Sequence, residues 1–122
     1  MIYEIAVLPV PEDRIALFRR AFAEVAPLLT RAKGYCGHML AQGIESPQQF
    51  NLIVRWQSLE DHTPGFEESE DHQLFMQGLA QYFSAEPTVY HIEGAAFAAG
   101  EQADSNSAVS LGSAGASKGV WF

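Results

Sequence analysis

The chain has 122 residues, of which 48% are apolar and 18% are charged, and these proportions are typical of one globular domain. Its net charge of −8, with only seven scattered basic residues, argues against a nucleic-acid partner, because phosphate binding needs clustered Lys and Arg. No apolar run approaches the ~20 residues of a membrane-spanning helix. The chain starts with a strand-like run rather than a signal sequence and has one cysteine, Cys36, so we expect a cytoplasmic protein.

Histidines and Cys36 are the residues most able to bind a metal. His38, His62, His72 and His91 show no tight ligand spacing. We therefore expect no metal site.

The first third of the chain predicts a strand followed by a helix. Residues 2–8 are apolar and partly β-branched, and prolines follow them. Asp13 is predicted to cap a helix, and Pro27 should kink its last turns. Gly34 suits the position just past the helix end. The apolar stripe of this helix recurs at steps of three and four: Ile15, Phe18, Phe22, Val25 and Leu29.

Residues 35–44 and 50–56 predict an antiparallel hairpin. On its second strand, Trp56 shares one face with Phe50, Leu52 and Val54, whereas Asn51 and Arg55 fall on the other face. On its first strand, alternation places His38 with Cys36 and Leu40, and places Tyr35 with Gly37 and Met39.

The remaining elements are two helices and a fourth strand. Ser58 and Asp61 resemble a capping box that opens a short helix, which Pro64 and Gly65 should stop. Ser69 is predicted to cap a longer helix, and residues 88–92 form the fourth strand. The residues expected to face inward from the longer helix are apolar: Leu74, Phe75, Leu79, Tyr82 and Phe83.

The composition divides the chain into two parts. Residues 1–93 form the predicted domain, and residues 94–122 form a tail rich in Gly, Ala and Ser that is flexible by composition. The tail ends in Val120, Trp121 and Phe122, which could dock on the domain or on a partner, or form a frayed end.

The element order predicts an α+β fold. It is a ferredoxin-like βαββαβ antiparallel sheet with helices on one face. The other face also needs cover, because several strand residues are too apolar to be left in water whichever face each takes: Tyr3, Ile5, Val7, Met39, Ile53 and Tyr90. A second copy of the sheet is the simplest cover, so we expect a homodimer with face-to-face sheets.

The strand that ends in Trp56, followed by Ser58, His62, Ser69, His72 and Phe75, resembles the antibiotic biosynthesis monooxygenase superfamily of small dimeric α/β barrels. The resemblance covers residues 1–93. It implies a monooxygenase that needs no cofactor and acts with O₂ on a small aromatic, phenolic or quinol-like substrate. A phenolate or carbanion can itself pass an electron to O₂, so the enzyme must bind the substrate, help to deprotonate it and exclude water.

The same resemblance implies a set of site residues. Trp56 would be a catalytic pocket wall, and His62 and His72 would assist deprotonation, since histidine titrates near neutral pH. Asn51 and Arg55, the latter facing an oxyanion, are further candidates for substrate binding. Sequence position adds two more: Phe66, which follows Pro64 and Gly65, as a lid, and His38, which lines the same cavity if its strand face is the helix-covered one and otherwise lies at the dimer face. Residue type alone also allows simpler roles: a core tryptophan, capping or structural histidines, and a dimer ion pair at Arg55.

Two other functions stay open. The first is a non-catalytic ligand-binding or scaffold dimer of the same fold. The second is the haem-degrading branch of the superfamily, which the resemblance associates with an asparagine on the first strand and a histidine ten residues after the tryptophan. Residues 2–8 contain no asparagine, and the ten-residue step from Trp56 reaches Phe66.

Overall fold

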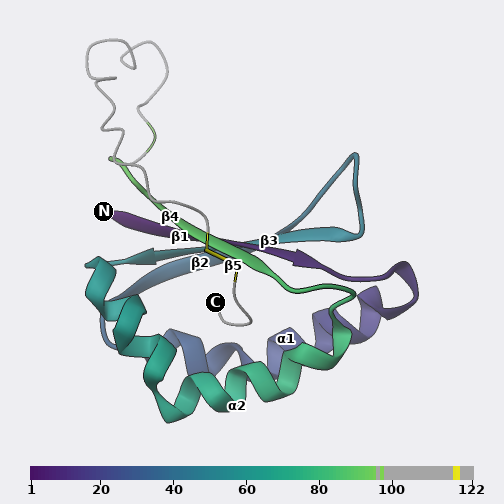
Figure 1. Ribbon diagram of the computed structural model, residues 1–122, viewed down its shortest axis with the longest axis horizontal. Helices are drawn as coiled ribbons and strands as arrows, with labels where there is room; N and C mark the ends of the chain where they lie inside the picture. Colours follow the sequence, from purple (N-terminus) through teal and green to yellow (C-terminus); the bar gives the residue numbers. More distant parts are fainter. Residues whose placement is uncertain (96, 98–116, 119–122) are drawn as a thin grey trace.

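The computed structural model describes residues 1–95, Phe97 and the backbone of residues 117–118. The elements follow the predicted strand and helix order (Figure 1). They are β1 (Ile2–Pro9), η1 (Glu12–Arg14), α1 (Ile15–Thr30), β2 (Tyr35–Gln42), β3 (Gln49–Trp56), η2 (Asp61–Gly65), η3 (Phe66–Glu68), α2 (Glu70–Leu79), η4 (Ala80–Tyr82), β4 (Thr88–Glu93) and β5 (Ser117–Lys118). This is the α+β ferredoxin-like arrangement that the sequence predicts.

The sheet is antiparallel, with strand order β2-β3-β1-β4-β5. Both long helices cover one of its faces (Figure 1). The central strand β1 places Glu4 opposite Val54 of β3 and His91 of β4. These three residues therefore share the helix-covered face of the sheet.

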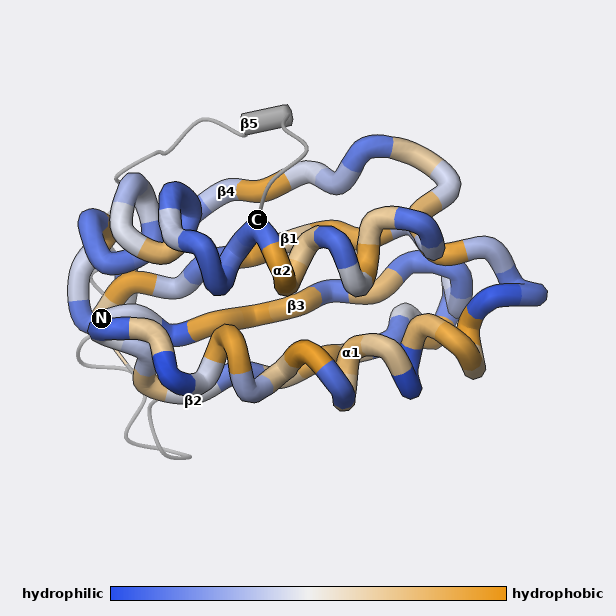
Figure 2. The backbone as a smooth tube through the Cα atoms, turned by 90° about the horizontal axis from the view of Figure 1, so that it is seen from below, coloured by the Kyte–Doolittle hydropathy of each residue, from blue (hydrophilic) through white to orange (hydrophobic). Residues whose placement is uncertain are grey.

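The core lies between that face and the two helices. Seen from the helix side, α1 and α2 lie next to each other, and much of β3 is hydrophobic along its length (Figure 2). The largest side chains that are completely or almost completely buried include Trp56, Phe18, Phe50, Phe75 and Leu8.

Helix α1 differs from the prediction at its start. Asp13 lies inside the 3-10 turn η1, and the residue before α1 is Arg14, which makes no capping hydrogen bond through its side chain. The helix continues through Pro27 to Thr30. Past its end, Gly34 has a φ of 83°, a left-handed conformation that favours glycine.

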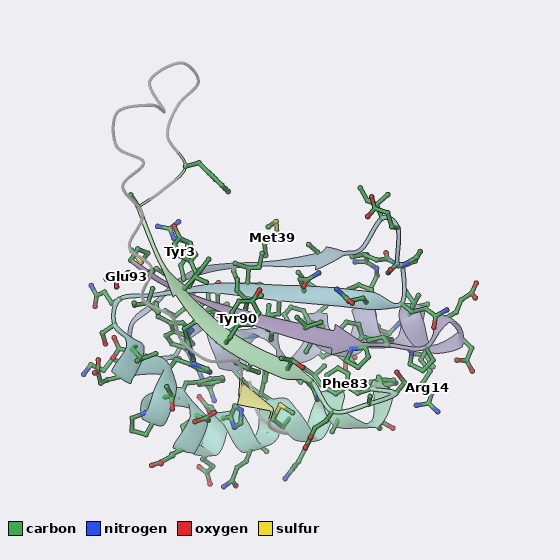
Figure 3. The ribbon with its side chains drawn as sticks, turned by 45° about the horizontal axis from the view of Figure 1, so that its top comes forward. Tyr3, Arg14, Met39, Phe83, Tyr90 and Glu93 are labelled. Carbon is green, nitrogen blue, oxygen red and sulfur yellow. The ribbon has the colours of Figure 1, made fainter. Side chains whose placement is uncertain are left out.

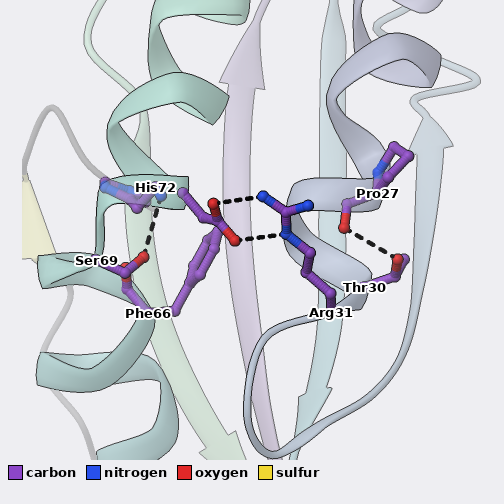
Figure 4. A network of polar contacts seen from close by, with 7 residues as sticks. Pro27, Thr30, Arg31, Phe66, Ser69 and His72 are labelled. Atoms are coloured by element: carbon purple, nitrogen blue, oxygen red, sulfur yellow. Dashed lines mark hydrogen bonds and ion pairs between the residues drawn. The ribbon is translucent and has the colours of Figure 1, made fainter.

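Helix α2 begins as predicted but turns a different face inward. The Ser69 hydroxyl accepts a hydrogen bond from the His72 backbone N–H at 3.1 Å, and Arg31 at the end of α1 forms a two-pronged ion pair with Asp71 at 2.7 Å (Figure 4). The prediction for Leu74 is wrong, because 47% of this residue is exposed. The buried residues of the helix instead follow the spacing of a single stripe: His72, Phe75, Met76 and Leu79.

The segment between β3 and α2 is a tight turn rather than a regular short helix. Ser58 accepts a hydrogen bond from the Asp61 backbone N–H at 3.3 Å and donates one to the Asp61 carboxylate at 3.0 Å. Pro64 lies within η2, a π-helical turn, instead of ending it, and η3 follows directly. This packing carries the side chains of His62 and Phe66 into the core.

A bulge in β2 changes one predicted face. The pairing register shifts between Tyr35 and Gly37, and the φ of Gly37 is 139°. As a result Tyr35 pairs with Trp56 and lies near its ring, on the same side of the sheet as His38. The prediction that Tyr35 shares a face with Met39 is therefore wrong.

The face of the sheet that the helices leave open carries a row of apolar residues. Met39, Ile53, Ile5 and Tyr90 are register partners across four strands. Met39 is 55% exposed and Ile92, near the end of β4, is 49% exposed. Figure 3 shows Tyr3, Met39 and Tyr90 on this open face.

Most of the predicted tail, including its three final residues, lies outside the described residues. Its described part pairs β5 with β4, with Ser117 opposite Val89. Among the described residues, none of the helices has the length and hydrophobicity that crossing a membrane would require.

Candidate functional site

Trp56 ends β3 on the helix-covered face and is completely buried. Its ring stacks against that of His62, with ring centres 5.4 Å apart and an angle of 23° between the planes. Tyr35 approaches edge-on at 6.5 Å, and Phe66 lies 5.9 Å away. Trp56 is thus enclosed by aromatic rings from β2, η2 and η3.

His62 is completely buried and bonded to a second histidine. Its Nδ1 lies 2.8 Å from Nε2 of His91 on β4, so one ring donates a hydrogen bond through its N–H and the other ring accepts that hydrogen bond. Burial, followed by the neighbouring His91 and His72, lowers the pKa of His62 to about 3. His62 is therefore a neutral imidazole at pH 7.

Glu4 and His91 are the residues of this site that the sequence analysis missed. Oε1 of Glu4 accepts a hydrogen bond from the Trp56 indole N–H at 3.0 Å. The same oxygen is 3.3 Å from Nε2 of His62, although the two groups are not aligned as a hydrogen bond. The other oxygen, Oε2, is buried and has no hydrogen-bond partner.

The carboxyl of Glu4 is neutral at pH 7. Burial raises its pKa to about 8, the Trp56 hydrogen bond opposes that rise, and the nearby charge of Glu67 adds to it. The signal for this residue is present in the sequence: Tyr3 and Ile5 point to the open face, so Glu4 between them must point toward the core. An acid at an inward position of a central strand is rare unless it has a role.

His72 and Phe66 form a second layer behind the Trp56–His62 stack. The two rings meet edge-on with centres 5.2 Å apart, and Phe66 also contacts Phe75 at 5.8 Å. Both residues are buried, with 2% of His72 and 4% of Phe66 exposed. Phe66, predicted as a lid, is part of the core in this closed arrangement.

His38 lies on the same face of the sheet but beside Tyr35 rather than beside His62. The Tyr35 hydroxyl is 2.5 Å from His38 Nδ1, and the Phe22 ring packs edge-on against the imidazole. Burial lowers the pKa of His38 and raises the pKa of Tyr35, which favours the neutral form of each.

Asn51 and Arg55 lie on the other face of the sheet. Asn51 pairs with Val7, and Arg55 pairs with Tyr3. Arg55 borders an apolar hollow of about 580 Å³ on the open face, together with Tyr3, Met39, Ile53 and Phe97. The structure therefore separates these two residues from Trp56, His62 and Glu4.

The described residues contain no group of three His, Cys, Asp or Glu side chains placed to hold a metal ion. At the position that would carry the haem ligand, Phe66 has no coordinating atom. His62 and His91 are hydrogen-bonded to each other. These residues do not fit a haem site.

The arrangement combines flat aromatic rings with acid and base groups in a largely buried place, where Trp56, His62 and Glu4 are buried and His91 is partly buried. Such an environment strengthens electrostatic interactions and suits proton transfer to or from an aromatic molecule. Trp56 and His62 supply the rings, while Glu4, His62 and His91 supply the groups that exchange protons.

Comparisons with known proteins identify relatives of the same size as the domain. The family described as antibiotic biosynthesis monooxygenase matches residues 1–78. The Bacillus subtilis protein YczJ, named as uncharacterized, is 36% identical over 93 residues, which are 76% of this chain and 98% of YczJ.

Solved structures agree with this match. A Bordetella bronchiseptica protein named "Putative antibiotic biosynthesis monooxygenase" is 34% identical with a TM-score of 0.74, over 77% of this chain and 96% of that one. SnoaB from Streptomyces nogalater, described as a cofactor-independent oxygenase, shares the fold with a TM-score of 0.64 at 16% identity, over 82% of this chain and 97% of SnoaB. The strand that ends in Trp56 and the helical segment after it fall within the matched residues, and the chain belongs to the antibiotic biosynthesis monooxygenase family.

Proposed function

We propose that the protein is a cofactor-independent monooxygenase that oxidises a small phenolic or quinol-like aromatic compound with O₂. The observation that carries this proposal is the stack of Trp56 on His62 directly beside the neutral carboxyl of Glu4. An aromatic substrate would lie against the Trp56 ring, and a group that accepts protons would be within reach of its hydroxyl.

The proposed reaction needs no external reductant. Loss of a proton gives a phenolate or carbanion, which passes one electron to O₂. In a methylene compound of the anthrone type, a CH₂ group becomes C=O, one oxygen atom enters the product, and the other leaves as water. The substrate supplies all four electrons, so the protein has to bind, deprotonate and exclude bulk water.

Substrate entry requires movement of η3. Trp56 and His62 have no exposed surface, and Phe66 lies against Trp56 from η3. An outward displacement of η3 would remove Phe66 from the Trp56 ring, while His62 on η2 keeps its contacts with Glu4 and His91. The substrate would then take the place of Phe66 beside that ring.

An O₂-uptake assay with a panel of quinols, anthrones and flavonols tests the proposal. We expect uptake by the native protein and a loss of about 100-fold or more in Trp56→Phe and His62→Ala variants that remain folded. Gln73→Ala, an exposed position on α2, is the matched control and should keep full activity. Absence of uptake with every compound, or full activity in Trp56→Phe, would contradict the proposal.

A second candidate is a non-catalytic ligand-binding or scaffold dimer. It is favoured by the way Trp56, His62 and Phe66 fill the space between helices and sheet with their own rings. This candidate predicts that aromatic ligands raise the melting temperature of the folded protein without any O₂ consumption.

We also propose that the protein is a homodimer whose sheets pack face to face. The open face presents the row of Met39, Ile53, Ile5 and Tyr90, and no helix among the described residues covers it. Water-exposed rows of this kind are typical of interfaces. A second copy would cover the hollow beside Arg55, and its own identical row would be buried at the same time.

A further inference from the structure

We propose that Glu4, His62 and His91 form a proton-transfer chain that links the Trp56 end of the site to the protein surface, with Glu4 as the group that takes the proton from the substrate. The inference rests on the proposed function for the identity of the proton donor. The chain itself rests on the geometry of three side chains from β1, η2 and β4.

The contacts run in one direction from the buried carboxyl toward the surface. Glu4 is 1% exposed and lies 3.3 Å from Nε2 of His62, and Nδ1 of His62 lies 2.8 Å from Nε2 of His91. His91 is only partly buried. Each imidazole therefore has one nitrogen toward the inner neighbour and the other available for the next step outward.

Both tautomers of the histidine pair are compatible with these distances, and a small rotation that aligns Nε2 of His62 with Oε1 of Glu4 would turn their 3.3 Å contact into a hydrogen bond. With the proton of His62 on Nδ1, its Nε2 can accept the carboxyl proton of Glu4, and Nδ1 can donate to His91. With that proton on Nε2, His62 directs its N–H toward a Glu4 carboxylate, and its Nδ1 accepts a hydrogen bond from the His91 N–H. Moving between the two states shifts one proton along the chain and leaves both imidazoles neutral.

Proton transfer along these three residues proceeds in consecutive steps. The Glu4 proton moves to His62 Nε2, the His62 Nδ1 proton moves to His91 Nε2, and His91 releases the proton of its other nitrogen to water. The substrate O–H bond then breaks, its proton binds Oε2 of Glu4, and a phenolate remains. One proton has passed from substrate to solvent, and Glu4 is again neutral with its proton on Oε2. Both imidazoles are left in the opposite tautomer, so each must exchange its ring proton before the next turnover.

The free oxygen of Glu4 marks the point where a substrate hydroxyl would enter. Oε1 is held by the Trp56 N–H, whereas Oε2 is buried without a partner. A buried polar atom without a hydrogen-bond partner lowers the stability of the fold unless a bound ligand or water molecule supplies the missing hydrogen bond. A substrate stacked on Trp56 would have its hydroxyl next to this oxygen.

The charged and titratable groups around Glu4, His62 and His91 favour the neutral form of Glu4 and His62 in the resting state. Glu67 on η3 opposes ionisation of Glu4, and its charge favours protonation of His91. His72 on α2 and His91 on β4 both disfavour protonation of His62. Proton transfer in which His62 stays neutral is therefore favoured over transfer through a protonated, positively charged His62.

A pH-jump experiment without substrate tests the chain independently of any enzymatic activity. Infrared absorption at the carboxylic-acid C=O band follows ionisation of Glu4, and Glu4→Gln identifies the band by removing it. We expect rapid loss of the band after a jump to a pH well above 8, the approximate pKa of Glu4. Glu24→Gln, at an exposed position on α1, should leave the signal intact.

Two variants of His91 distinguish a relay from a structural role. His91→Gln keeps a hydrogen-bonding partner for His62 but cannot pass a proton on, so ionisation of Glu4 should slow by about 100-fold. In His91→Ala the rate should recover when imidazole is added. An unchanged rate in His91→Gln, or absence of a titrating carboxyl band, would overturn the relay. A relay without O₂ uptake would overturn the proposed function alone.

Discussion

Glu4 is a buried ionisable residue that contacts both aromatic rings of the candidate site, those of Trp56 and His62. Trp56 and His62 were predicted from residue type and from the family resemblance, and the structure brings these two together. Nothing in the family resemblance points to Glu4, because the resemblance associates the first strand with an asparagine. Strand alternation places Glu4 on the face opposite to Tyr3 and Ile5, whereas its approach to the Trp56 indole depends on the sheet register.

The pH dependence of stability should report the state of Glu4. The pKa of Glu4 is higher in the folded state than in the unfolded state. Its contribution to the free energy of unfolding is therefore fully present below pH 4.5 and is lost as the pH rises toward 8. His62 acts oppositely, since its pKa falls from 6.5 to about 3 and its contribution is lost only as the pH decreases below 6.5. Between pH 6.5 and 8 only the Glu4 contribution is therefore falling among these two.

We expect the free energy of unfolding to decrease by roughly 1–2 kcal/mol across that interval, as measured by urea denaturation. Glu4→Gln should abolish the decrease, because glutamine does not ionise. Glu24→Gln, which removes an exposed carboxylate, should preserve it. An equal decrease in Glu4→Gln would mean that another group titrates.

At the scale of elements, the order of strands and helices and the Ser69 cap were predictable because they depend on local sequence signals. The inward face of α2 was only partly predictable: Leu74 is exposed, and the stripe through Phe75 and Leu79 also includes His72 and Met76. Two histidines in the core are not expected from hydropathy. The bulge that turns Tyr35 toward Trp56 depends on pairing between strands, which no local signal specifies.

The contact between α1 and α2 depends on a glycine. A Cβ atom added to Gly78 would lie 2.6 Å from Cγ1 of Val25, closer than packed carbon atoms allow. Gly78→Ala should therefore lower the free energy of unfolding by roughly 1–3 kcal/mol despite the better helix propensity of alanine. Chemical denaturation measures the effect.

The double variant Val25→Ala/Gly78→Ala provides the matched test of this contact. With the Val25 methyl groups removed, the alanine at position 78 has space, and the added substitution should be neutral or stabilising relative to Val25→Ala alone. Equal destabilisation in both backgrounds would show that the close approach is not the cause.

For the whole molecule, the predicted element order already implied a sheet with one face that the helices leave open, whereas the residues on that face follow from the structure. Ile53 lies at the centre of that face, between Ile5 and Met39. Ile53→Arg should convert a dimer into a monomer in sedimentation velocity experiments, because a dimer would bury two unpaired charges. Leu74→Arg, on the exposed side of α2, should leave the mass unchanged; a native protein that sediments as a monomer would contradict the proposed dimer.

The two faces of the sheet offer different places for an aromatic ligand, so the face that the ligand occupies decides whether Trp56 belongs to the substrate site. The helix-covered face carries Trp56, His62 and Glu4, while the open face carries the hollow beside Arg55. The decisive measurement is an NMR titration of the native protein, without O₂, with a quinol that supports O₂ uptake or, failing that, with an anthrone analogue. We expect the Trp56 indole N–H signal to shift when the ligand is added. In a pH titration the same signal should change over the pH range in which Glu4 ionises. Shifts confined to Tyr3, Ile53 and Arg55, with an unchanged Trp56 signal, would contradict the assignment of the site.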